Sequence, residues 1–231
     1  MAHDQALLDD ANRTGRAFLR VYRFDPPCLS FGRNEPTARY DRAAIAHERI
    51  DVVRRPTGGR AVWHEHEVTY AVAAPIAVFG GLREAYRAIH ARLAAALHSL
   101  GVDATLAPDR LTARPPDRRS ACFATSVGGE VLVAGRKLVG SAQVRQGDAV
   151  LQHGSILLAG SQEMVRRLSG EREPGTGETT LAAVLGRAML FDEVAAAIVA
   201  AWGDDLSPAA LSRPLPSSAA CFSDPSWTWR R

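Results

Sequence analysis

Three side chains in the second half of the sequence have the chemistry to act together on an acyl group. Cys122 lies in SACFATS, directly after an arginine-rich stretch, Lys137 lies in GRKLVGSAQ, and His153 lies in LQHGS. Nearby positive charge favours the thiolate form of a cysteine, which is the form that attacks a carbonyl carbon. With a lysine to manage protons, this set predicts acyl transfer. The alternative, that Cys122 is a small buried apolar residue, stays equally open on the residues alone.

The stretch RRPTGGRAVWHEHEVTY, which begins at Arg54, supplies a second set of groups. The adjacent glycines Gly58 and Gly59 let a ligand approach the main chain, whose N–H groups can hold a carbonyl or phosphate oxygen. Arg54 and Arg55 alternate in a strand, so we expect one to face a site and the other to be a solvated charge. Arg60 could cover a bound ligand. The pattern is neither a P-loop nor GxGxxG, and a plain hairpin turn is the alternative.

Two histidines in the same stretch raise the question of a metal. We expect His64 and His66 to point to one face of a strand. However, HExxH is absent and no third ligand lies at a typical spacing. A hydrogen-bonded histidine that lines a pocket is therefore favoured, and no metal is expected.

The sequence holds 27 arginines and a single lysine, Lys137. A lysine that persists against such a bias is a candidate for chemistry that arginine cannot supply, because only lysine readily loses its proton when buried. Chance survival is the alternative.

Composition limits the class of protein. The 231 residues are 46% hydrophobic and have a formal net charge of +3, which is too weak to indicate nucleic-acid binding. The three cysteines lack CxxC spacing, so we expect a reducing compartment, the cytoplasm. No signal peptide or membrane-spanning segment is expected. Cys28 is expected to be a packing residue, and Cys221 is the second candidate nucleophile.

Hydrophobic periodicity predicts an α+β chain with a mostly antiparallel sheet. Helices are expected at residues 2–13, 41–48, 81–101, 160–169, 178–186 and 190–203. Strands are expected at residues 18–24, 28–32, 50–55, 61–64 and 67–75, with three more in 130–158 that turn at 134–135 and 147–148.

Three further expectations concern how these elements are organised. Strands 137–145 and 149–157 would form a hairpin that brings Lys137 and His153 to one sheet. Residues 107–120 should form an exposed loop. We expect one domain over residues 1–231, in which 171–231 form a helical and irregular C-terminal extension.

Together, RRPTGGRAVWHEHEVTY and GRKLVGSAQVRQGDAVLQHGSILL resemble the lipoate–protein ligase A family, within it most closely the LipM-type octanoyltransferases. The opening DQALLDDANRTGRAFLRVYRFDPPCLSFGRNEP is also similar to the start of that family. The resemblance covers residues 1–170. It implies a single biotin/lipoate-ligase-like catalytic domain with a mixed, mostly antiparallel sheet flanked by helices.

The resemblance also implies a reaction. An octanoyl group would pass from octanoyl-acyl carrier protein to Cys122 and then to a lysine of a lipoyl domain, such as the glycine cleavage H protein. Lys137 matches the family lysine that contacts the acyl carbonyl. The implied acyl-binding residues are Arg54, Thr57, Gly58, Gly59, Arg60, Ala61, His64, Gly140, Ser141, Ala142, His153 and Gly154. Neither a cofactor nor a nucleic-acid or membrane partner is implied.

Three alternatives remain. A lipoate–protein ligase would use the same turn and lysine with ATP and Mg²⁺ and would need no cysteine. An octanoyl amidotransferase would move the acyl group between lipoyl domains. A non-catalytic partner of lipoyl domains with a decayed site is the third. Cys122 at the transferase position and the short chain favour the octanoyltransferase.

Overall fold

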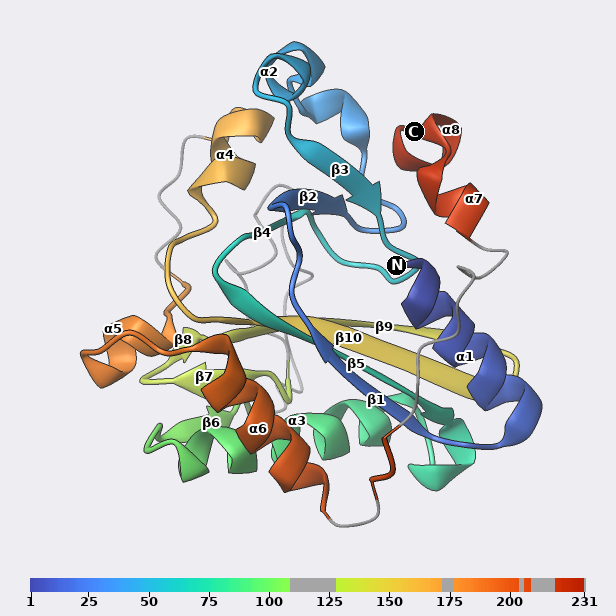
Figure 1. Cartoon of the computed structure of the whole chain (residues 1–231), viewed down its shortest axis with the longest axis vertical. Coiled ribbons are helices and arrows are strands. Elements are labelled where there is room, and N and C mark those ends of the chain that lie inside the picture. The colour runs from blue at the N-terminus through green and yellow to red at the C-terminus, as the bar shows by residue number, and fades with distance from the viewer. Residues whose placement is uncertain (109–127, 172–176, 204–205, 209–218, 231) are drawn as a thin grey trace.

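The structure, a computed structural model, describes residues 1–108, 128–171, 177–203, 206–208 and 219–230 (Figure 1). Cys122 and most of the loop predicted at residues 107–120 lie outside the described residues.

An antiparallel sheet of four strands forms the centre of the fold, in the order β1, β5, β10, β9. The strands are β1 Phe18–Tyr22, β5 Glu67–Pro75, β9 Val139–Gln146 and β10 Ala149–Leu157. β9 and β10 are joined at Gly147, whose φ of 56° suits glycine and falls in the predicted turn. The prediction of an α+β fold with mostly antiparallel pairing is confirmed.

The two faces of the central sheet bury different side chains, because neighbouring residues of a strand point to opposite sides. The helices that cover the sheet are α1 Ala2–Thr14, α3 Leu82–Ser99 and α6 Phe191–Trp202. Tyr70 and Val72 of β5 belong to the core formed with α3 and α6. Ala71 and Ala73 contact the core formed with Leu8 of α1, where small side chains let the helix approach closely. Figure 1 shows α3 and α6 on one side of this sheet and α1 on the other.

A second sheet of three strands lies above the central one in Figure 1, in the order β3, β2, β4. Its strands are β2 Cys28–Phe31, β3 Asp51–Arg54 and β4 Val62–His64. β2 and β3 are parallel, and the crossover between them contains η1 Thr37–Arg39 and α2 Arg42–His47. Asp41 begins α2 as its N-cap, accepting hydrogen bonds from the backbone of Ala43 and Ala44.

The hairpin predicted from strands 137–145 and 149–157 is confirmed as β9 and β10, but Lys137 belongs to a third sheet. It contains β6 Ala104–Leu106, β7 Val131–Val133 and β8 Arg136–Lys137. The chain changes sheets at the fully buried Leu138, whose N–H bonds to Val131 of β7 while its carbonyl accepts from Leu157 of β10. The expectation that Lys137 and His153 share a sheet is therefore wrong, and the segment 130–158 forms four strands instead of three.

The remaining elements are η2 Ile76–Val78, α4 Glu163–Ser169, α5 Leu181–Leu185, α7 Ala219–Ser223 and α8 Pro225–Thr228. The helices expected at 160–169, 178–186 and 190–203 are confirmed, with shorter bounds. The described part of the C-terminal extension contains α7 and α8, and the side chain of Asp224 accepts from Ser226 at the start of α8. None of the described helices combines the length and apolar character needed to cross a membrane.

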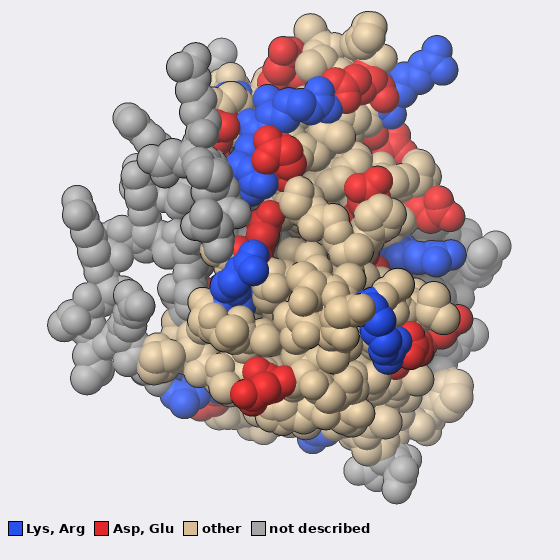
Figure 2. All heavy atoms as spheres, turned by 90° about the vertical axis from the view of Figure 1, so that its left-hand side faces the viewer, with Lys and Arg blue, Asp and Glu red and all other residues tan. Residues whose placement is uncertain are grey.

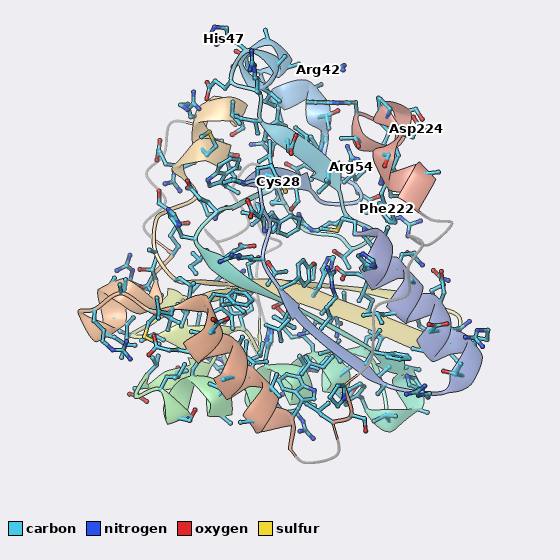
Figure 3. The ribbon with its side chains drawn as sticks, in the orientation of Figure 1. Cys28, Arg42, His47, Arg54, Phe222 and Asp224 are labelled. Carbon is cyan, nitrogen blue, oxygen red and sulfur yellow. The ribbon has the colours of Figure 1, made fainter. Side chains whose placement is uncertain are left out.

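Arg54 attaches this tail to the second sheet. Its side chain is fully buried and donates to the carbonyls of Thr228 and Arg230, at 3.0 Å each, and to Gly32 at 2.7 Å. Figure 3 places it between β3 and the tail. Arg55 is also buried, so the expectation that one of these arginines is a solvated charge is wrong. Both are satisfied by main-chain oxygens, which a planar guanidinium with five N–H groups can collect.

Charges of both signs meet on the face seen in Figure 2. Arg167 of α4 binds Glu48, which follows α2, through both carboxylate oxygens, and Arg166 binds Glu163 within α4. Among the residues that the structure describes, this face mixes charges of both signs and forms no basic patch.

The core of α3 allows a matched test of packing. Leu93 is fully buried, whereas Leu82 of the same helix is 39% exposed. Leu93→Ala should lower the free energy of unfolding by about 2–5 kcal/mol, because it removes buried methyl groups and leaves a cavity. Leu82→Ala should cost less than about 1 kcal/mol. Urea denaturation of both variants measures the difference, and equal losses would contradict the assignment of this face of α3 to the core.

Candidate functional site

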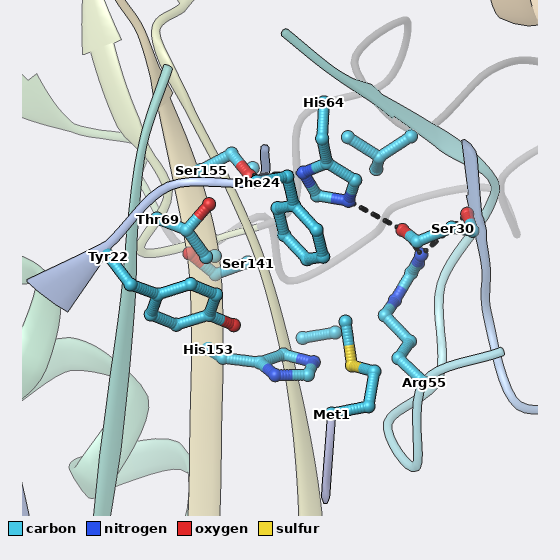
Figure 4. Close-up of a pocket in the computed structure, with 14 residues that line it drawn as sticks. Met1, Tyr22, Phe24, Ser30, Arg55, His64, Thr69, Ser141, His153 and Ser155 are labelled. Atoms are coloured by element: carbon cyan, nitrogen blue, oxygen red, sulfur yellow. Dashed lines mark hydrogen bonds between the residues drawn. The ribbon is translucent and has the colours of Figure 1, made fainter. Parts of the chain in front are cut away.

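A cavity with about 360 Å³ of atom-free space lies between the central sheet and the second sheet (Figure 4). Strands from both sheets supply its walls. Its lining residues are Met1, Tyr22, Phe24, Ser30, Arg55, Val62, His64, Thr69, Gly140, Ser141, Ala142, His153, Gly154 and Ser155. Six of the predicted acyl-binding residues are in this set: His64, Gly140, Ser141, Ala142, His153 and Gly154.

The paired strands β9 and β10 supply the glycines of the cavity. Gly154 pairs with Ser141, and Gly140 pairs with Ser155. A Cβ atom added at Gly154 would lie 2.3 Å from the carbonyl oxygen of Gly140. Glycine is therefore required at 154 for the two strands to approach as they do.

The Gly-Gly turn supports the cavity from outside its lining. Gly59 has a φ of 85°, and its carbonyl oxygen would lie 1.9 Å from a Cβ added at Gly32. The N–H of Arg33 donates to Thr57 at 2.7 Å, which holds the same two loops together. Thr57, Gly58, Gly59, Arg60 and Ala61 are not among the residues that line the described cavity.

Of the two neighbouring arginines, Arg55 lines the cavity and Arg54 does not. Arg55 donates to the main-chain oxygen of Ser30 at 3.1 Å and to its hydroxyl at 3.0 Å. It also donates to the carbonyls of Gly58 and Arg60. Arg55 therefore holds the Gly-Gly turn against β2 and places positive charge beside a hydroxyl of the cavity.

His153 lies in the middle of a buried hydrogen-bonded chain. Its Nε2 is 2.6 Å from the hydroxyl of Thr57, and its Nδ1 is 3.1 Å from Asp4 of α1. Asp4 also binds Arg20 at 2.6 Å and accepts from Tyr22. Burial opposes ionisation of Asp4, but the hydrogen bond to His153 and nearby positive charge outweigh it and hold the pKa of this carboxyl well below its ordinary value. Burial lowers the pKa of His153, so it is neutral at pH 7.

His64 lies in a similar chain at the end of β4. Its Nε2 is 2.7 Å from the hydroxyl of Ser30, and its Nδ1 is 2.5 Å from Glu67. The ring of Phe24 lies 4.2 Å away, centroid to centroid. Figure 4 shows His64 and Ser30 joined at the edge of the cavity.

His66 does not share the face of His64, so that expectation is wrong. β4 ends at His64, and His66 lies in the turn before β5 with its side chain 59% exposed. Across the residues the structure describes, no group of three or more histidine, cysteine or acidic side chains could hold a metal ion.

Lys137 is buried away from the lining of the cavity. Its Nζ lies 2.5 Å from Glu130, and both side chains are at most 4% exposed.

The two described cysteines, Cys28 and Cys221, differ in burial. Cys28 is buried, and burial together with the charge of Glu67 raises its pKa to about 12, so it packs as an unreactive thiol. Cys221 is exposed in α7.

A polar chain crosses the other face of the central sheet. His90 of α3 donates to the carbonyl of Gly129 at 2.7 Å, and its Nε2 is 2.8 Å from the hydroxyl of Ser141. Ser141 in turn is 2.7 Å from the hydroxyl of Tyr70. Burial and the charge of Lys137 lower the pKa of His90 to about 4, against the raising effect of the Gly129 bond.

Sequence reasoning missed the two carboxylates and one hydroxyl of these chains. Asp4 shares a helix face with the apolar Leu8 and Ala11, which is an unusual place for an acid and was a usable signal. Ser30 is the one polar residue of the buried strand β2. Asp4 and His153 are 149 residues apart in the sequence, so no pattern indicated that they would be hydrogen-bonded.

Comparison with known proteins gives matches in sequence and in fold. The family model of the lipoyl protein ligase A/B catalytic domain matches residues 1–203. The octanoyltransferase LipM of Moorella thermoacetica is 42% identical over 165 residues, which cover 68% of this chain and 60% of the relative. That of Symbiobacterium thermophilum is 37% identical over 213 residues, 84% of this chain and 78% of the relative.

The chain spans about 60% of the length of the first relatives it matches. Among solved structures, the crystal structure of a lipoate-protein ligase A bound with ATP superposes with a TM-score of 0.80 at 20% identity. That match covers 99% of this chain and 92% of the other. It confirms the predicted ligase-like catalytic fold.

The protonation of His90 generates a test. A histidine whose pKa is about 4 in the folded state and 6.5 when unfolded stabilises the fold above pH 6.5, and this contribution is lost as the pH falls toward 4. Between pH 7 and pH 5 the loss should be roughly 2 kcal/mol. His90→Gln should lack this component, so its unfolding free energy should fall less over that range. Urea denaturation at both pH values measures it; equal pH dependence of the two proteins would refute a neutral, buried His90.

Proposed function

Because the chain belongs to the lipoyl protein ligase A/B catalytic domain family, we propose that it is an octanoyltransferase. It moves an octanoyl group from octanoyl-acyl carrier protein to a lysine of a lipoyl domain, such as the glycine cleavage H protein. The observation that supports this most is the 42% identity to an octanoyltransferase LipM over 165 residues.

The reaction proceeds in two steps through an enzyme thioester. The Cys122 thiolate attacks the carrier thioester, a new C–S bond forms, and the carrier thiolate leaves and takes up a proton. The neutral acceptor amine then attacks the enzyme thioester and gives up a proton to a base, an amide bond forms, and Cys122 leaves as thiolate. This route splits one difficult exchange into two and uses no cofactor.

The cavity supports an acyl ligand. Its lining combines apolar side chains with a few polar groups, as ligand sites commonly do. Phe24, Val62 and Ala142 give it apolar wall, and His64, His153 and Arg55 give it polar groups. We propose that the octanoyl chain lies against the apolar wall with its carbonyl toward the polar groups.

Lys137 is proposed to assist at the acyl carbonyl. Its Nζ donates to the carboxylate of Glu130 at 2.5 Å. A compact ammonium on a flexible stem can move toward a developing negative charge, as a guanidinium of fixed planar geometry cannot.

A lipoate–protein ligase is the second candidate, because the fold matches an ATP-bound lipoate-protein ligase A with a TM-score of 0.80. In that case ATP and Mg²⁺ are required and Cys122 is a packing residue.

Mixing the protein with octanoyl-acyl carrier protein in the absence of ATP should give one octanoyl adduct that hydroxylamine removes. Intact-mass spectrometry detects it. Cys122→Ser should abolish the adduct without changing the melting temperature. The matched Cys221→Ser variant should retain the adduct. An adduct lost only in Cys221→Ser would assign the nucleophile to the tail, and ATP-dependent attachment of free octanoate without any adduct would establish the ligase.

Lys137→Arg should lower transfer to a lipoyl domain by about 100-fold or more, since the positive charge stays but the compact ammonium proposed to assist at the acyl carbonyl is replaced by a larger, planar guanidinium. The matched control is Arg136→Lys in the same strand, where the side chain is exposed. Single-turnover transfer to apo-H protein measures both. Parent-like activity of Lys137→Arg would show that only the charge matters.

A further inference from the structure

Two chains of hydroxyl, imidazole and carboxylate reach the cavity, one from each sheet. Ser30, His64 and Glu67 form the first, with contacts of 2.7 and 2.5 Å. Thr57, His153 and Asp4 form the second, with contacts of 2.6 and 3.1 Å. Both have the order found in Ser-His-acid triads, in which the imidazole takes a proton from the hydroxyl side.

The carboxylate of Glu67 determines the tautomer of His64. A carboxylate can only accept, so Nδ1 of His64 bears a hydrogen and donates to Glu67. In the neutral imidazole Nε2 then has no hydrogen, and it accepts from the Ser30 hydroxyl at 2.7 Å. The Ser30 oxygen also accepts from the Arg55 guanidinium at 3.0 Å. In this tautomer the basic nitrogen of His64 faces the cavity hydroxyl.

The two chains differ in how their carboxylates are compensated. Asp4 already binds the Arg20 guanidinium at 2.6 Å and the Tyr22 hydroxyl. Glu67 has His64 as its only ion-pair partner within the described residues; otherwise one of its oxygens accepts from Thr69. Its second oxygen, Oε2, is buried and has no hydrogen-bond partner in that part of the chain. An imidazolium at His64 would thus face an uncompensated carboxylate, whereas one at His153 would compete with Arg20.

The other titratable groups beside Glu67 stay neutral at pH 7. Burial and the charge of Glu67 raise the pKa of Cys28, which lies opposite His64 in β2. Burial, Asp4 and also Glu67 hold the pKa of Tyr22 well above 10. Arg55 stands at the Ser30 end of the chain, where its positive charge favours a hydroxyl that is giving up its proton.

We propose that Ser30 and His64 accept the proton of the attacking amine in the second step, with Glu67 as the positioning residue that stabilises the imidazolium. This inference rests on the proposed octanoyl transfer. As the C–N bond forms and the C–S bond breaks, the amine proton passes to Ser30, the Ser30 proton passes to His64, and the thiolate leaves with the electron pair. His64 then returns the proton to the thiolate, so the amide and the thiol are the only products.

The test compares two nucleophiles on one isolated octanoyl-enzyme. The lysine of apo-H protein needs a base, whereas hydroxylamine is largely neutral at pH 7 and has much less need of one. His64→Gln should slow transfer to apo-H protein by about 100-fold or more while hydroxylamine cleavage stays near the parent rate. Ser30→Ala and Glu67→Gln should also lower the ratio of the transfer rate to the hydroxylamine cleavage rate. His153→Gln is the matched control, and it should change both rates together and leave the ratio unchanged.

The outcomes separate the inference from the function on which it rests. Equal loss of both reactions in His64→Gln would mean that His64 only shapes the cavity, and the inference would fall. An unchanged ratio in Ser30→Ala, which removes a single oxygen, would overturn the relay even where His64→Gln does not fold. A parent protein that forms no octanoyl-enzyme would refute the proposed transfer itself, and the relay with it.

Discussion

The hydrogen bond between Thr57 and His153, 2.6 Å long, joins the second sheet to the central sheet. Thr57 belongs to the turn that follows β3, and His153 belongs to the centre of β10. The same imidazole binds Asp4, so helix α1 is tied to this contact as well. Elements separated by 96 and 149 residues thus converge on one buried ring. Because an unpaired polar group costs free energy in such a place, the cavity beside the ring can form in only a narrow range of geometries.

Arg54 and Arg55, at the end of β3, hold two further parts of the chain in place. Arg54 collects main-chain oxygens from the β2–η1 loop and from the tail after α8, and Arg55 collects them from β2 and the Gly-Gly turn. Their charge is spread over carbonyl dipoles, which lets a guanidinium sit in a site with little water and still order a loop.

The sequence predicted the fold class and most helices, because these depend on local periodicity. Six of the twelve residues predicted from the motifs to bind the acyl group line the cavity, and their role stays a prediction. The predictions were wrong where contacts between distant parts of the chain determine the structure. Alternation predicted that Arg54 and Arg55 differ in exposure, but the tail covers one and the turn covers the other. The β8–β9 break at Leu138 was invisible in GRKLVGSAQ, because a continuous apolar pattern does not say when a strand leaves its sheet. The polar partners of the histidines come from α1, β2 and β5, and only their positions in otherwise apolar faces hinted at them.

The position of Lys137 in a different sheet from His153 divides the chemistry between two places. The buried Lys137–Glu130 pair lies at the third sheet, whereas the imidazoles of His64 and His153 line the cavity between the central sheet and the second sheet. Ser141 lies between these two places. It lines the cavity, and its hydroxyl contacts His90, whose pKa is lowered in part by the charge of Lys137. With Lys137 in the third sheet and His64 at the cavity, an acyl carbonyl would be polarised from one direction and the amine that attacks it would be deprotonated from another. That separation matters because an ammonium close to a base would lower the affinity of the base for a proton.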